Sequence, residues 1–119
     1  MLISVVHRSD VLGEAIALVL RDAGYCVDRG ESNAPDLVLV GVEASREGAS
    51  AVKSARRRWR GAEIVALVSP NWKHTPSFGR HLRMAGASNA IAGAFSAAEL
   101  VAFVRSIQPD GAASLCAAE

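Results

Sequence analysis

The residue types that most often carry out chemistry in proteins occur here without the partners that they need. His74 and His81 are seven residues apart, and no cysteine or cluster of acidic residues joins them, so we expect no metal site. The sequence contains no Gly-x-Ser-x-Gly segment, no cysteine–histidine pair and no phosphate-binding glycine loop. These absences favour a protein that is not an enzyme and that holds no cofactor.

A run of cations around Trp59 is the most conspicuous local feature. Its members are Lys53, Arg56, Arg57, Arg58 and Arg60. A basic segment with an aromatic residue is typical of surfaces that contact phosphates and stack on bases, so one hypothesis is nucleic-acid binding through residues 53–60. The helical spacing favours another interpretation, in which Trp59 packs inward with Val52 and Ala55 while the arginines stay in solvent.

The charge is divided unevenly along a chain whose net charge is +1. Residues 1–45 contain seven acids and three bases, whereas residues 46–85 contain nine bases and two acids. A basic middle third on a nearly neutral protein indicates either a surface for a partner or a helix face that is simply solvated. The small net charge excludes a strong overall attraction to polyanions.

A regular backbone must position these residues, and the hydrophobic pattern predicts one. Short apolar segments rich in β-branched residues alternate with stretches in which apolar residues recur every three or four positions. The predicted strands are 2–6, 25–27, 36–42, 63–68 and 89–92, and the predicted helices are 10–23, 47–60, 76–85 and 96–107. The alternation predicts an α/β fold, a flavodoxin-like three-layer sandwich with a five-stranded parallel sheet of order 2-1-3-4-5.

The connection between the second and third strands is too short for the usual helix. Only about eight residues, 28–35, separate these strands, whereas a parallel crossover normally needs a dozen or more. The sequence therefore predicts either an extended loop in place of a helix or a displaced second strand. A missing helix would also leave the sheet edge near 28–35 open as a binding surface.

Four segments together resemble the receiver domains of response regulators, the CheY-like domains, over residues 2 to about 107. They are the first helix and its exit (14–25), the third strand (35–40), the turn into the fifth strand (85–90) and the start of the last helix (95–100). The resemblance implies a module of bacterial two-component signal transduction or transcriptional control. Residues 1–107 would be the receiver-like domain, and residues 108–119 a flexible tail or the start of a linker.

The resemblance also implies a phosphorylation pocket, whose reactive residues this sequence lacks. In chain order the pocket positions fall on His7, Arg8, Gly41, Val68 or Ser69, and Gly93. Phosphoryl transfer needs a carboxylate nucleophile and a divalent cation. Gly41 supplies no nucleophile, and Arg8 brings a cation to the place of a hard metal ion. We therefore expect a degenerate pseudo-receiver that binds no Mg²⁺ and is not phosphorylated on aspartate.

The altered pocket leaves two residues with more than one interpretation. Arg8 either pairs with Glu43 or Asp10, in place of a metal–carboxylate cluster, or points to solvent. His7 could change its charge near neutral pH. A structural role is more typical of a lone histidine at the end of a strand.

Without a phosphorylation switch, the domain is expected to act through contacts with a protein partner, a signalling or output protein. The predicted face covers residues 76–107, where a symmetric dimer is one expectation. The charged residues on and beside it are Lys73, Arg80, His81, Arg83, Glu99 and Arg105. Two alternatives remain open. One is a small-molecule-binding regulatory domain with its ligand in the emptied crevice around Ser9, Gly41 and Ser69. The other is nucleic-acid binding through 53–60, which is less favoured for this domain alone because no helix-turn-helix segment follows.

The sequence gives no sign of a membrane segment. No apolar run is long enough to span a bilayer, and no secretory leader is recognisable at the start. We therefore expect a cytoplasmic protein without membrane contact.

Overall fold

The predicted succession of strands and helices is present in the computed structural model, which describes residues 1–42, 45–68, 76–92 and 95–107. In chain order the elements are β1 (Leu2–Val6), α1 (Asp10–Asp22), β2 (Cys26–Asp28), β3 (Leu37–Val42), α2 (Ser45–Arg58), β4 (Glu63–Val68), α3 (Pro76–Ala85), β5 (Asn89–Ala92) and α4 (Ala97–Ile107). All strands are parallel and lie in the order β2-β1-β3-β4-β5, which confirms the predicted flavodoxin-like topology.

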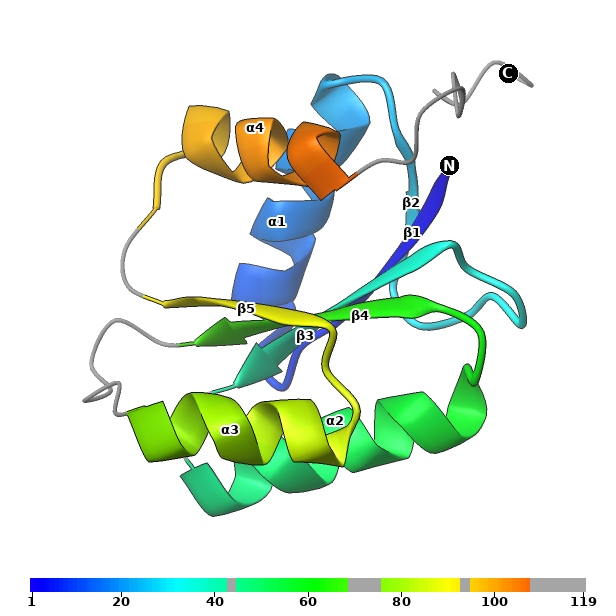
Figure 1. Cartoon of the computed structure of the whole chain (residues 1–119). Helices are drawn as coiled ribbons and strands as arrows, with labels where there is room; N and C mark the ends of the chain where they lie inside the picture. Colours follow the sequence, from blue (N-terminus) through cyan, green and yellow to red (C-terminus); the bar gives the residue numbers. More distant parts are fainter. Residues whose placement is uncertain (43–44, 69–75, 93–94, 108–119) are drawn as a thin grey trace.

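Helices α1 and α4 cover one face of the sheet, and α2 and α3 cover the other (Figure 1). The strands serve both faces, because successive side chains of a strand point to opposite sides. In β3, Leu37 and Leu39 pack toward α1 and α4. Val38 and Val40 pack toward α2 and α3. All four side chains are buried, as in a central strand of a parallel sheet that is covered on both faces.

Residues 29–36 join β2 to β3 as an extended loop, which is the first of the two alternatives that the short connection predicted. Ser4 of β1 fastens the start of this loop: its hydroxyl donates to Asp28 Oδ1 (2.5 Å) and accepts the N–H of Gly30 (3.0 Å). Asp28 Oδ1 also accepts the N–H groups of Gly30 and Glu31. Gly30 has a positive φ of 81°, a conformation that favours glycine. These bonds satisfy the polar atom of Ser4, which is fully buried.

Trp59, just beyond the end of α2, covers part of the sheet beside this loop. Its side chain is 4% exposed and packs in the same core cluster as Val40 and Val52. The indole Nε1–H donates to the carbonyl oxygen of Ser32 at 2.8 Å, which ties the loop to the ring. A Cβ atom built on Gly30 would lie 4.0 Å from the ring, so the loop packs against the indole. The loop and the indole together take the place of the missing crossover helix.

The helices that the structure describes are short. The longest of them, α2, has 14 residues. None of the described helices combines the length and the apolar character that a bilayer crossing requires.

Candidate functional site

His7 and Gly41 lie side by side at the carboxyl ends of β1 and β3, the end at which open α/β sheets bind ligands. The parallel register pairs Val6 with Val40, so the residues that follow them are neighbours across the two strands. A Cβ atom built on Gly41 would lie 2.6 Å from His7 Nε2 and 2.7 Å from His7 Cγ. Both distances are too short for a real contact, so the imidazole ring occupies the space that a side chain at position 41 would need.

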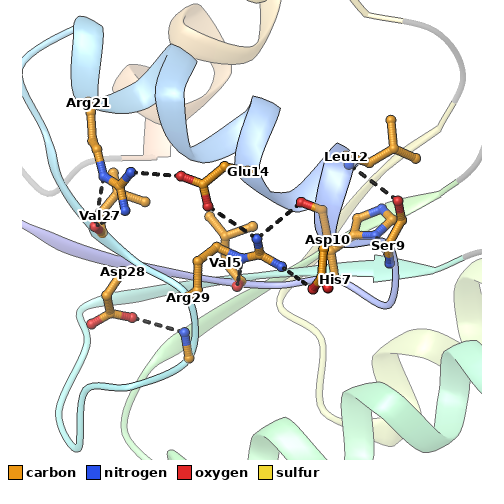
Figure 2. A network of polar contacts seen from close by, with 11 residues as sticks. Val5, His7, Ser9, Asp10, Leu12, Glu14, Arg21, Val27, Asp28 and Arg29 are labelled. Atoms are coloured by element: carbon orange, nitrogen blue, oxygen red, sulfur yellow. Dashed lines mark hydrogen bonds and ion pairs between the residues drawn. The ribbon is translucent and has the colours of Figure 1, made fainter.

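The backbone that follows His7 holds its ring in this position. His7 Nδ1 accepts the N–H of Ser9 at 2.9 Å, which requires that this nitrogen carries no proton. Ser9 is also the N-cap of α1, since its hydroxyl accepts the N–H of Leu12 at 3.3 Å (Figure 2). The His7 ring therefore lies beside Gly41 in the part of the predicted crevice that the structure describes, whereas Ser69 lies outside the described residues.

The structure describes only some of the other predicted pocket positions. Arg8 has an exposed side chain, and Val68 is buried at the end of β4, where it pairs with Val42. Three residues lie outside the described part of the chain: Glu43, Ser69 and Gly93. The carboxylate of Asp10, one of the two expected partners of Arg8, lies 3.9 Å from the guanidinium of Arg29.

Arg29, which the sequence did not single out, lies in a polar network between α1 and the end of β2 (Figure 2). Its guanidinium donates to the carbonyl oxygens of Val5 (3.3 Å) and Asp10 (3.3 Å). It also pairs with Glu14 at 3.4 Å. A Cβ atom built on Gly13 would lie 2.5 Å from Arg29 Cζ, so this glycine lets the guanidinium lie against α1. A glycine inside a helix lowers stability by up to about 1 kcal/mol relative to alanine. The presence of Gly13 in the predicted helix was therefore a signal, in the sequence, that another group lies close to that helix.

Arg21, near the end of α1, extends the network to the edge of the sheet. Its Nη1 donates to Glu14 Oε1 at 3.1 Å. Its Nε and Nη2 both donate to the carbonyl oxygen of Val27, at 3.2 and 3.1 Å. Val27 belongs to β2, the outermost strand on this side, so the two arginines fasten α1 to the edge of the sheet.

Replacing Arg29 with methionine should keep much of its aliphatic contact and remove its donors. The carbonyl of Val5, a residue that is 1% exposed, would then lose this partner. We expect the free energy of unfolding, measured by urea denaturation, to fall by about 1–2 kcal/mol, as for a buried acceptor left unsatisfied. Arg21→Met removes a more exposed guanidinium and should cost less than about 1 kcal/mol. Equal losses in the two variants would contradict the special role of Arg29.

The structure divides the basic run 53–60 into inward and outward residues. Trp59 packs in the core, as the helical spacing predicted, and is therefore not available to stack on a base. For Arg56 the prediction of a solvated arginine is wrong: its guanidinium donates to backbone carbonyls that include those of Gly86 (2.7 Å) and Ala62 (2.8 Å). The bond to Gly86 joins the C-terminal end of α2 to the turn after α3. The exposed cations of the run are Lys53, Arg57, Arg58 and Arg60.

The predicted interaction face spans helices on opposite sides of the sheet, with β5 at the edge between them (Figure 1). Of the residues predicted for this face, Arg80, His81 and Arg83 are exposed on α3, and Lys73 lies outside the described residues. Glu99 is also exposed, but its carboxylate accepts the N–H of Ser96 (3.1 Å) in the predicted capping box of α4. Arg105 lines a groove of about 400 Å³ between α4 and α1. A single face that includes Arg105 therefore stays a prediction.

Comparison with known proteins finds similar structures. No protein-family model and no curated protein matches the sequence. A protein described as a response regulator from Chloroflexus aurantiacus is 28% identical, with a TM-score of 0.68 over 89% of this chain and 95% of that one. An orphan response regulator from H. pylori is 23% identical, with a TM-score of 0.66 over 89% and 94%. A protein described as pilus assembly-related, from Burkholderia pseudomallei, has 15% identity and a TM-score of 0.70 over 89% and 87%.

Proposed function

We propose that this chain, which belongs to the receiver domains of response regulators, transmits signals through protein contacts without being phosphorylated. The receiver fold and its strand order are shared with structures of response regulators. Receiver domains are signalling modules rather than enzymes. This chain differs in the residues at the carboxyl ends of β1 and β3, which are His7 and Gly41.

The position of the His7 ring over Gly41 is the observation that carries the proposal. The resemblance places the phosphoacceptor at residue 41, and glycine has no side chain that could receive a phosphoryl group. The imidazole occupies the space that the Cβ atom of a phosphoacceptor side chain at this position would need. The Mg²⁺ ion of the family does not fit these residues either, because neither His7 nor Arg8 offers the carboxylate oxygens that this ion prefers.

Incubation of the purified chain with acetyl phosphate and Mg²⁺ tests the proposal. We expect the intact mass to stay unchanged, whereas a phosphorylated protein gains about 80 Da for each phosphoryl group. An active receiver domain treated in parallel shows that the phosphodonor works. A gain of that size in this chain, located by peptide mapping, would overturn the proposal.

The proposal includes the way in which the signal is passed on. Residues 1–107 would act as one receiver-like domain in the cytoplasm, and binding would depend on the concentration of the partner rather than on a phosphoryl group. The partner would be another protein or a second copy of this chain on α3, β5 and α4. The support for this part is that Arg80, His81 and Arg83 of α3 are exposed.

A further inference from the structure

We infer that the outer face of α2 and α3 is a docking surface for an acidic protein segment that carries an apolar residue. This inference rests on the proposed function, since it assigns a surface and a class of partner to a module that acts by contact. It combines the basic run of α2 with the cations of α3. The sequence alone had grouped these α3 cations with α4.

The charged side chains of these two helices whose exposure the structure describes have one sign. The exposed cations on or just after them are Lys53, Arg57, Arg58, Arg60, Arg80 and Arg83. In the sequence of the two helices the one acidic residue is Glu47, in the first turn of α2. The opposite face differs, because α1 and α4 carry both signs on exposed residues: Asp10, Glu14, Asp22 and Glu99 against Arg21 and Arg105. The basic excess of the middle third is thus concentrated in the α2–α3 layer.

The packing of α2 against α3 places the cations of the two helices in one layer. Helices α2 and α3 pack side by side (Figure 1). The bond from Arg56 Nη2 to the carbonyl of Gly86 places the C-terminal end of α2 beside the end of α3. Cations in a last helical turn also stabilise the helix dipole, which accounts in part for Arg57 and Arg83. Lys53 and Arg80 lie about one turn earlier, beyond the reach of that effect, and point to a further role of the charge.

Met84 adds an apolar contact to this basic layer. Its side chain is 81% exposed, the largest exposure among the large hydrophobic residues that the structure describes. Met84 follows Arg80 by four positions, so the two side chains are neighbours on α3. An exposed, flexible methionine adapts well to the apolar side chain of a protein partner. Nucleic acid fits less well, because Trp59, the aromatic residue of the basic run, is in the core.

A synthetic peptide rich in glutamate and aspartate, with one central leucine, tests this surface. The ¹⁵N-labelled full chain is titrated with the peptide, and changes in its amide chemical shifts locate the contact. The dissociation constant is measured at low and at high salt. Shifts are expected on residues 53–60 and 80–85. Arg57→Glu and Arg80→Glu should each weaken binding about fivefold to tenfold at low salt, with the effect reduced at high salt. Met84→Ser should weaken the binding of the peptide that carries leucine. It should leave unchanged the dissociation constant of a peptide with serine in place of that leucine.

Arg21→Glu on α1 is the matched control, because it reverses one exposed arginine on the other face of the sheet. It should change the dissociation constant by less than about twofold. Shifts confined to α1 and α4, equal losses of affinity in Arg21→Glu and Arg57→Glu, or no shift at millimolar peptide would overturn the inference. Tighter binding of a DNA duplex than of the peptide, unaffected by Met84→Ser, would overturn it in favour of nucleic acid. None of these outcomes changes the acetyl phosphate experiment, so the inference can fail while the proposed function stands.

Discussion

Replacing Trp59 with alanine is expected to lower the free energy of unfolding by about 3–5 kcal/mol. The substitution empties the core between α2, the sheet and the loop 29–36, and it removes the Nε1–H that donates to the carbonyl of Ser32. Domains of this size are stable by only about 5–15 kcal/mol, so the variant should unfold at a much lower urea concentration. Amide hydrogen exchange should also become faster in the loop 29–36 than in the strands.

Two control variants separate the contributions of the indole. Trp59→Phe keeps an aromatic ring and removes the hydrogen bond to Ser32, which should cost about 1 kcal/mol for that bond. Arg58→Ala removes the guanidinium that lies 4.4 Å from the ring centroid, and should cost about 0.5–1 kcal/mol. A loss in Trp59→Ala no larger than in Trp59→Phe would show that the loop does not depend on the volume of the indole.

Gly41→Ala is expected to destabilise the fold by about 1–3 kcal/mol, because the new methyl group would overlap the His7 ring. The same substitution in a His7→Ala background should cost less than about 1 kcal/mol, since the obstructing ring is gone. Urea denaturation of the wild type, both single variants and the double variant gives the coupling between the two positions. We expect a coupling of about 1–2 kcal/mol.

The steric argument also applies to attempts to restore phosphorylation. Gly41→Asp introduces a carboxylate, but the His7 ring and the missing metal ligands remain, so acetyl phosphate should still leave the mass unchanged. If Gly41→Ala and His7→Ala were additive within about 0.5 kcal/mol, the two residues would not compete for space. That result would remove the structural basis of the proposed function.

The parts of the fold that follow from local patterns could be predicted from the sequence. Alternating apolar strands and helical stripes predicted the parallel sheet and its order. The length of the 28–35 segment left two alternatives, a loop in place of the crossover helix or a displaced second strand, and the structure shows the loop. The inward position of Trp59 followed from its helical spacing with Val52 and Ala55. Each of these predictions depends on neighbours in the sequence or on chain length alone.

The parts that depend on tertiary contacts could not be predicted. Arg56 and Arg57 are adjacent and chemically identical, and no local pattern shows that the turn at Gly86 lies close enough to accept hydrogen bonds from Nε and Nη2 of Arg56. The contact of His7 with Gly41 depends on the register between β1 and β3, which no local pattern fixes. Comparison with the family's motif shows only that both positions lack the expected reactive residues. The structure shows in addition that the His7 ring occupies the space that a side chain at position 41 would need.

The bonds from Arg21 to Val27 bear on how copies of this protein can associate. An outer strand with unpaired backbone groups invites strands of other molecules to pair with it, and many proteins protect such borders with short strands and charged side chains. Strand β2 has only three residues, and its Val27 carbonyl already accepts two N–H groups from Arg21. Lateral growth of the sheet into fibrous assemblies is thereby hindered on this side.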